Sequence, residues 1–212
     1  MATLSVQDAG LTLFHQICEH LEARNAQVRI LFVDFSSAFN TIQIHVLLRK
    51  LLEMNVNGNL ILWIYSYLSE RPQYTRIKNV KSDIVFTNTG VPQGCVLAPL
   101  LFTLYTNDCS SNFPSSSIIK YADDTAIVGK VNNDDSNDFM AQVNNFVSWC
   151  NDNFLNLNVK KTKEMVIDFR VKNHVPDTIV IANEQVERVK EYMYIGMIID
   201  DNGICKHTTG IQ

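Results

Sequence analysis

The 212-residue sequence predicts an α+β domain in which helices and strands alternate around one sheet. Apolar residues recur at helical spacing in several long segments, whereas short runs rich in β-branched and aromatic residues lie between turn residues. No repeat, linker or low-complexity segment interrupts this order. The composition, with 46% apolar and 19% charged residues, is that of an ordinary globular protein. We therefore expect residues 1–212 to form a single domain with a substantial core.

The first half of the chain opens with a helix. From Gln7 to Arg24 the apolar residues recur every three or four positions, which is the spacing of one helix face. The dense run VRILFVDF then predicts a buried strand that ends at Asp34. The segments that follow are expected to be a helix over 45–55, a helix over 59–71 and a two-stranded hairpin over 73–90.

The second half begins with a Gly/Pro loop at Gly90, which becomes an apolar helix from about Val96. The stretch SIIKYADDTAIVGKV predicts two short strands joined by a tight turn at Asp123 and Asp124. Residues 134–156 indicate an amphipathic helix, and the runs KEMVIDF, DTIVIAN and YMYIGMIID indicate strands. The residues expected on the buried face of that helix are Phe139, Val143, Phe146, Val147, Cys150 and Phe154.

Charge and cysteine content narrow the function only weakly. The formal net charge of -4 and the pI of 5.7 give no compositional sign of a nucleic-acid binder. The cysteines are far apart and lack the spacing of a zinc site, so we expect small buried apolar residues in a reducing compartment. The first residues lack the pattern of a signal peptide, and no apolar run is long enough to span a membrane.

Two of the expected strands end in acidic residues. Asp34 closes one strand, and Asp123 with Asp124 forms the turn of another pair. Three carboxylates at one edge of a sheet repel one another, and a pair of divalent cations would remove this repulsion. Two such ions also support in-line phosphoryl transfer. The alternative is an ordinary turn, because Asp is common in turns.

The order of three longer motifs favours the metal site. The segments LFVDFSSAFNTI, NTGVPQGCVLAPLLFTLYTND and IIKYADDTAIVG resemble motifs A, B and C of the reverse transcriptases of non-LTR (LINE-type) retrotransposons, particularly the vertebrate kind. The segments LNLNVKKTKEMVI and EYMYIGMIID resemble motifs D and E. The resemblance covers nearly the whole chain and implies a polymerase palm-type antiparallel sheet backed by helices, with partial fingers and little or no thumb.

The resemblance assigns roles to residues of motifs A and C. It implies that Asp34, Asp123 and Asp124 bind two Mg²⁺ ions, for which Mn²⁺ can substitute, and that the backbone carbonyl of Phe35 completes a metal shell. Asp34 and Asp123 would bridge both ions. In motif C it also implies that Tyr121 lies beside the primer end and that the small Ala122 leaves room for the strand.

The resemblance also implies a nucleotide site. Phe39 would exclude a 2′-hydroxyl and so select dNTPs, with the small Ala38 letting the backbone approach; an ordinary core aromatic is the alternative. Gln93 and Gly94 would contact the nucleotide or the template base, although they are also compatible with a plain polar loop. Ala98 stands where the family usually has Ser.

Motifs D and E carry weaker assignments. One of Lys160, Lys161 and Lys163 would neutralise or protonate the leaving pyrophosphate, and Lys161 is preferred, although a solvated run of charge fits equally well. The segment 192–196 would form a hairpin that holds the primer; a core strand with a turn glycine is the alternative.

The resemblance implies RNA-directed DNA polymerase activity, with an RNA template, a DNA primer and dNTPs as partners, no membrane, and a place in the cytoplasm and nucleus. Upstream fingers, a thumb and an endonuclease of a longer polyprotein are expected to be missing. Two alternatives remain open: an inactive retrotransposon relic that serves as a binding module, and an RNA-dependent RNA polymerase. Phe39 and the YADD string argue against the latter.

Overall fold

A computed structural model describes residues 6–170, 175–202 and 205–207. The chain divides into two compact units, one of Met1–Ser36, Cys109–Cys150 and Leu157–Gln212, the other of Ser37–Asp108 and Asn151–Asn156. The expectation that residues 1–212 form a single domain stays a prediction. Within the described residues, no helix is both long and apolar enough to cross a lipid bilayer.

The first unit contains a five-stranded sheet in the order β11-β8-β1-β7-β6. Strand β1 (Ala26–Val33) pairs antiparallel with β7 (Asp124–Asn132) on one side and with β8 (Lys163–Ile167) on the other. Strand β6 (Ser116–Tyr121) pairs antiparallel with β7, and the short β11 (Glu187–Arg188) pairs parallel with β8. All residues of β1 are buried, as expected for a central strand covered on both faces.

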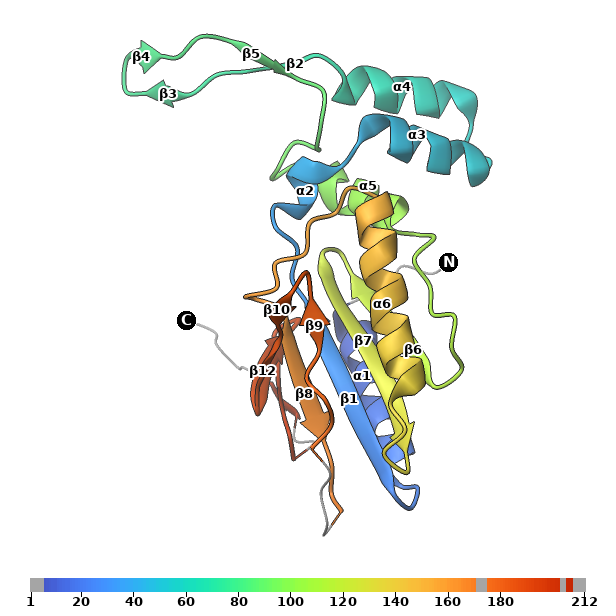
Figure 1. The fold of residues 1–212 in the computed structure, drawn as a ribbon. Helices are drawn as coiled ribbons and strands as arrows, with labels where there is room; N and C mark the ends of the chain where they lie inside the picture. The colour runs from blue at the N-terminus through green and yellow to red at the C-terminus, as the bar shows by residue number, and fades with distance from the viewer. Residues whose placement is uncertain (1–5, 171–174, 203–204, 208–212) are drawn as a thin grey trace. The chain divides into compact units, whose positions relative to one another are not determined.

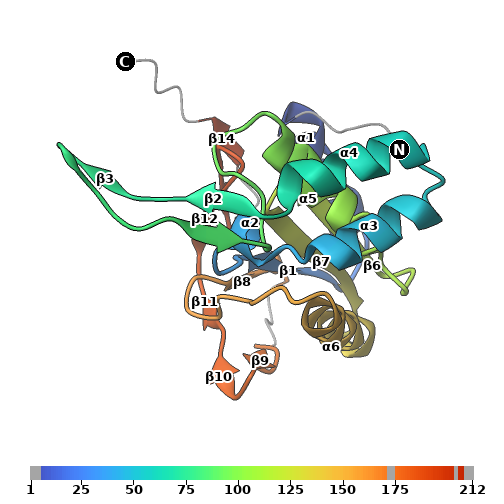
Figure 2. The same cartoon turned by 90° about the horizontal axis from the view of Figure 1, so that it is seen from above.

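Two helices cover the two faces of this sheet, α1 (Val6–Leu21) on one and α6 (Asn137–Asp152) on the other (Figures 1 and 2). Leu13 and Ile17 of α1 join the core that contains Ile30 of β1. On the face of α6, the guanidinium of Arg29 lies 4.9 Å from the ring centre of Phe139. Neighbouring residues of β1 point to opposite faces, so a strand that is buried along its whole length contacts both helices.

The C-terminal part forms a second sheet, with β12 (Glu191–Tyr194), β13 (Met197–Asp200) and β14 (Cys205–His207) in that order. The ring of Tyr192 stacks on Phe32 with centroids 4.3 Å apart, and Tyr194 is buried in the core. A two-strand ribbon, β9 (Val180–Ile181) with β10 (Glu184–Gln185), precedes it. The α+β class is confirmed, but the expectation of one sheet was wrong, because the strands after β8 pair mainly with one another.

The second unit is mostly helical. It contains the short α2 (Ala38–Thr41), α3 (Ile44–Glu53), α4 (Gly58–Leu68) and α5 (Leu97–Tyr105). The side chain of Asn57 caps α4 by accepting a 2.9 Å hydrogen bond from the amide of Asn59. The buried ammonium of Lys50 donates to the carbonyl of Tyr105 at 2.7 Å and to Asp108 at 2.6 Å, which joins α3 to the end of α5.

A long hairpin connects α4 to the loop before α5. Its inner part pairs β2 (Arg71–Gln73) with β5 (Val85–Thr87), and its tip pairs β3 (Arg76–Ile77) with β4 (Val80–Lys81). Residues 72–86 are all exposed, and the hairpin extends away from α3 and α4 (Figure 2). The predicted two-stranded hairpin is therefore confirmed.

The other expected elements are present with shifted ends. The helix predicted over 134–156 spans only 137–152, and Phe139, Val143, Phe146 and Cys150 are buried as expected. Phe154 was placed wrongly, because it lies after the helix with φ 56° and 51% of its surface exposed. The expectation of buried cysteines holds for Cys109 and Cys150, whereas Cys18 is exposed and Cys95 is partly exposed.

Candidate active site

Asp34 is the first residue after β1. The pairing of β1 with β7 ends at Val33 opposite Thr125, so the next step of the register sets Asp34 opposite Asp124. The side chain of Asp34 is 34% exposed, yet its Oδ2 is buried and has no hydrogen-bond partner. A buried carboxylate oxygen without a donor is rare and requires an explanation.

Asp123 and Asp124 lie at the turn between β6 and β7. Tyr121 pairs with Asp124, which leaves Ala122 and Asp123 as the two turn residues. Ala122 has φ 50°, in the left-handed region that normally favours glycine. Tyr121 packs against the core of the sheet, and both aspartates are exposed. The sequence prediction of a tight turn at the acidic pair is confirmed.

The three carboxylates are close enough to influence one another. Although Asp124 is exposed, the surrounding protein partly desolvates its carboxyl and raises its pKa, and the negative charges of Asp123 and Asp34 raise it further. Burial raises the pKa of the Tyr192 hydroxyl, and the charges of Asp124 and Asp34 raise it further. The edge of the sheet where β1 ends and β7 begins therefore carries a concentrated negative potential.

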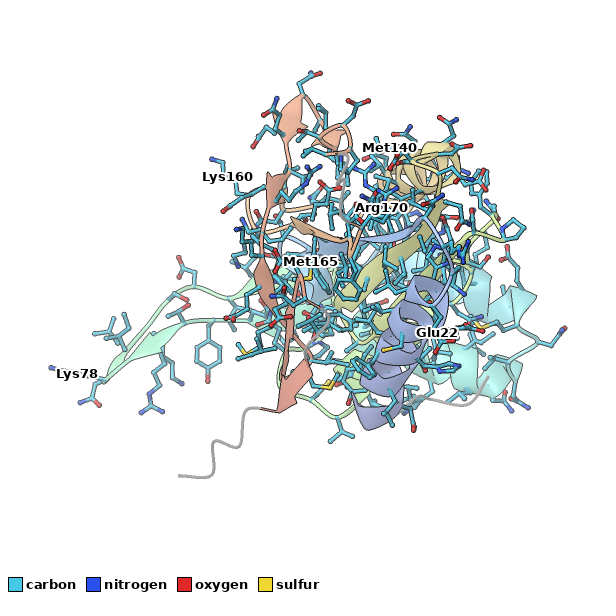
Figure 3. The ribbon with its side chains drawn as sticks, turned by 90° about the horizontal axis from the view of Figure 1, so that it is seen from below. Glu22, Lys78, Met140, Lys160, Met165 and Arg170 are labelled. Carbon is cyan, nitrogen blue, oxygen red and sulfur yellow. The ribbon has the colours of Figure 1, made fainter. Side chains whose placement is uncertain are left out.

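The three lysines of motif D have different contacts in the structure. The ammonium of Lys161 lies 4.0 Å from Asp34 Oδ2, and its side chain is 70% exposed. Lys163 instead donates to Glu187 and to the carbonyl of Lys160, each at 2.6 Å. Lys160 is an exposed residue at the surface (Figure 3). Lys161 is thus the lysine of this group for which the structure gives a contact with Asp34.

Phe35, which follows Asp34, packs its ring against Phe146 of α6 with centroids 6.3 Å apart. Its backbone forms an isolated bridge with Leu157. The expected metal-binding group was its carbonyl oxygen rather than its ring, so this packing is compatible with the assignment and leaves it a prediction.

The other expected nucleotide residues belong to the second unit. Ala38 is buried at the start of α2, and the half-buried ring of Phe39 packs against Phe102 of α5 with centroids 5.4 Å apart. This packing agrees with the alternative of a core aromatic, and a partly exposed ring can still contact a ligand. The role of Phe39 as a selector of dNTPs stays a prediction.

The loop of motif B is bonded to α2. Gly90 donates its amide to the carbonyl of Ile42 at 2.7 Å, and Val91 donates to the carbonyl of Phe39 at 2.8 Å. The exposed Gln93 donates its side-chain amide to Asn40 Oδ1 at 3.2 Å, and Gly94 is exposed with φ 78°. Motifs A and B are therefore joined by hydrogen bonds, although about 50 residues separate them in the sequence.

Two features, one in each unit, were not predicted. The Cys95 thiol and the Tyr67 hydroxyl share a hydrogen bond; burial raises the pKa of the thiol, but this bond and backbone amides such as that of Leu97 outweigh burial and lower it. In the first unit, Thr162 and Asn158 bind the backbone of Asp34. Both features are contacts between residues distant in sequence, so a local sequence pattern cannot predict them.

The carboxylates of the first unit are the candidate ligands for a metal ion. Among residues 6–170, 175–202 and 205–207, no three His, Cys, Asp or Glu side chains are arranged so that they could hold an ion together. The carboxylates nevertheless fit a hard cation in kind, because Asp34 offers an oxygen without a donor, and because desolvation and the charges of Asp123 and Asp34 raise the pKa of Asp124.

Comparison with known proteins decides the family. Residues 4–199 match the family described as reverse transcriptase (RNA-dependent DNA polymerase). The chain belongs to the reverse transcriptase family. Its relatives in Drosophila melanogaster include the probable RNA-directed DNA polymerase from transposon X-element, which is 25% identical over 86% of this chain. The RNA-directed DNA polymerase from mobile element jockey is also 25% identical, over 85% of the chain. These relatives confirm the resemblance to LINE-type enzymes.

The matches cover 20% of each of these two relatives, so the chain spans about a fifth of their length. Solved structures agree on the fold. A telomerase from Candida tropicalis in complex with a fragment of telomeric RNA superposes with a TM-score of 0.70 at 11% identity, over 100% of this chain and 34% of the other. A Candida albicans telomerase gives a TM-score of 0.64 at 15% identity, over 95% and 34%. The palm-type α+β fold of this reverse transcriptase domain is thereby confirmed.

Proposed function

We propose that this reverse transcriptase domain carries the palm chemistry of an RNA-directed DNA polymerase, adding dNTPs to a DNA primer on an RNA template. The observation that carries the proposal is the group of Asp34, Asp123 and Asp124 at one edge of a buried sheet, with Asp34 Oδ2 lacking a donor. Family membership supports the reaction class, and the carboxylates supply the chemistry it needs.

Two Mg²⁺ ions would be held by Asp34, Asp123 and Asp124, with the carbonyl of Phe35 as a further oxygen ligand. When bound, such ions favour ionisation of a primer hydroxyl and neutralise a triphosphate. The remaining tasks, which are to hold the ions and to offset charge, fall to side chains of this protein. The three carboxylates would hold the metal ions at the end of β1. Lys161, which lies beside Asp34, would offset negative charge on the leaving pyrophosphate.

Residues of the second unit would select the nucleotide. The partly exposed Phe39 would exclude a 2′-hydroxyl while Gln93 and Gly94 contact the nucleotide or the template base. Gly90 and Val91 donate hydrogen bonds to carbonyls of Ile42 and Phe39, in and just after α2. These bonds support the role, because they fix the loop of motif B against the segment that carries Phe39. A loop fixed in this way can orient a substrate with little loss of entropy.

The hairpin of the second unit favours a nucleic-acid partner despite the acidic chain. Residues 71–87 carry four basic residues and one acidic residue, whereas the whole chain has a net charge of -4. Lys78 lies in the turn at its tip (Figure 3), and the Lys81 ammonium lies 5.3 Å from the ring centre of the exposed Tyr74. Exposed cations interleaved with an aromatic ring suit a phosphate backbone with stacked bases.

Primer extension tests the proposal. The chain is incubated with poly(rA)/oligo(dT), dTTP and either Mg²⁺ or Mn²⁺, beside the double variant Asp123→Asn with Asp124→Asn. Extension by the parent and none by the variant is expected. Equal extension by both would contradict the assignment of these carboxylates. A folded parent that neither extends the primer nor binds Mn²⁺ would favour the inactive relic, and a preference for UTP over dTTP would favour an RNA polymerase. If the domain is active, the cytoplasm and nucleus are its proposed location.

A further inference from the structure

Asp34 directly follows the paired residues of β1 and is not itself paired with a neighbouring strand of the sheet. Pairing of β1 with β8 ends at Phe32, and pairing with β7 ends at Val33. The peptide groups of Asp34 therefore need partners other than a neighbouring strand. The loop Asn158–Thr162, which leads into β8, supplies a partner for the amide of Asp34 and another for its carbonyl.

The loop binds Asp34 from two sides. The amide of Asp34 donates to Thr162 Oγ1 at 3.2 Å, and the carbonyl of Asp34 accepts from the amide of Asn158 at 2.8 Å. Thr162 is 1% exposed, so its hydroxyl is held within the protein rather than in water. Phe35 continues the contact through its bridge with Leu157.

The loop is itself closed by hydrogen bonds. The carbonyl of Asn158 accepts from the amide of Lys161 at 3.1 Å and from that of Thr162 at 2.8 Å. The side-chain oxygen of Asn158 also accepts from the amide of Lys161 at 3.3 Å. Such a turn resists distortion, because the backbone and side-chain oxygens of Asn158 both accept hydrogen bonds within it.

The carboxylate of Asp34 lacks comparable support. Its Oδ2 accepts no hydrogen bond, and the ammonium of Lys161, on a side chain that is 70% exposed, lies 4.0 Å from it. The direction of this carboxylate is consequently set by its own backbone. A loop that holds the peptide groups of Asp34 thereby determines where its free oxygen points.

We infer that Thr162 is a positioning residue for Asp34, and that its hydroxyl, together with the turn at Asn158, holds the Asp34 carboxylate in the direction needed to bind a divalent cation. The inference rests on the proposed function, since it assumes that Asp34 is a metal ligand. It assigns to the loop a task beyond carrying a lysine. Partners that orient a metal ligand typically change metal affinity by about 10- to 100-fold when they are removed.

The test measures Mn²⁺ binding by the whole chain, which requires no turnover. Thr162→Val keeps the shape of the side chain and removes the acceptor, whereas Thr162→Ser keeps the acceptor. We expect Thr162→Val to weaken Mn²⁺ binding about 10-fold or more, with Thr162→Ser within about threefold of the parent. Asp34→Asn marks the complete loss of the site.

Controls separate positioning from general destabilisation. Thr106→Val removes another buried hydroxyl, which donates to the carbonyl of Phe102 at the end of α5, and should leave Mn²⁺ affinity unchanged. If Thr162→Val does not fold, Asn158→Ala loosens the same turn from its other end and should weaken binding in the same direction. Circular dichroism and thermal unfolding report on the fold of each variant.

The outcomes are distinct. A parent that binds Mn²⁺ through Asp34, with Thr162→Val binding equally well, overturns the inference and leaves the proposed function intact. Equal losses in Thr162→Ser, or in Thr106→Val, overturn it as well. A folded parent whose Mn²⁺ binding is unaffected by Asp34→Asn overturns the proposed metal site and the inference together.

Discussion

The ammonium of Lys161 lies 4.0 Å from the free Oδ2 of Asp34. Asp34 follows strand β1, whereas Lys161 lies in the loop before β8, more than 120 residues later in the chain. The lysine side chain is 70% exposed, so this pair contributes little to stability at the surface. The proposed chemical role of Lys161 therefore rests on its place beside Asp34 and requires no contribution of the pair to folding.

Replacing Lys161 by Met is expected to leave the free energy of unfolding within about 0.5 kcal/mol of the parent, because exposed ion pairs are weak. Primer extension should slow by about 100-fold, the effect typical of a lost proton donor. Lys163→Met is the matched control, since Lys163 donates to Glu187 instead. Equal slowing in the two variants would contradict the choice of Lys161. Single-turnover extension and urea unfolding measure the two quantities.

Gly90 is expected to be intolerant of any side chain. It has φ 70°, and an added Cβ would lie 2.7 Å from the Cα of Asn40 and 2.8 Å from the carbonyl oxygen of Phe39. The left-handed backbone alone penalises Ala by about 1–2 kcal/mol, and overpacking adds about 1–3 kcal/mol. Gly90→Ala should therefore unfold at a clearly lower urea concentration than the parent.

Gly94→Ala is the control for this substitution. Gly94 also has positive φ, at 78°, but nothing lies within 4 Å of an added Cβ. Its variant should show the backbone penalty without the clash and stay more stable than Gly90→Ala. Equal stability of the two variants would show that contact between motifs A and B does not restrict Gly90.

A buried charge cluster stabilises the sheet behind the site. Glu164 is fully buried and accepts hydrogen bonds from Arg29 Nε and from Arg188 Nε, each at 2.9 Å. Glu164→Gln would leave the buried Arg29 without its anion, which typically destabilises a protein by about 3–5 kcal/mol. Glu53→Gln, in an exposed pair with Arg49, should change stability by less than about 0.5 kcal/mol. Similar losses in the two variants would refute the importance of burial here.

Acid should destabilise the fold through Asp168. Hydrogen bonds from Arg170 lower the pKa of the Asp168 carboxyl despite its partial burial, and the amide of Gln27 adds a further bond. A lowered folded-state pKa means that this stabilisation is complete above the unfolded-state value of about 3.9 and is lost as the pH falls through the folded-state value. Asp168→Asn should therefore be less stable than the parent at pH 7, with the gap closing below about pH 4.

Urea unfolding at pH 7, 5 and 3 measures this gap. Asp83→Asn removes an exposed carboxylate of the hairpin and controls for the loss of one acidic group. A gap between parent and Asp168→Asn that stays constant over this pH range would contradict the assignment of the acid sensitivity to Asp168.

Local patterns determined much of this protein. The apolar spacing of the first helix and the unbroken apolar run of β1 predicted their elements, because such patterns depend only on near neighbours in the chain. The acidic residues at the end of β1 and at the turn before β7 were likewise visible in the sequence. So were the motifs that led to the family, which the match over residues 4–199 then confirmed.

Tertiary structure decided which of these residues meet. Arg29 and Glu164 are 135 positions apart, and neither side chain by itself indicates that it is buried. The contact of Lys161 with Asp34, the bond from Asp34 to Thr162 and the second sheet all depend on pairings between distant segments. Side-chain periodicity describes the face of one element, whereas contacts between elements are set by packing, so the sequence alone identified the acidic groups and only the folded chain showed what holds them.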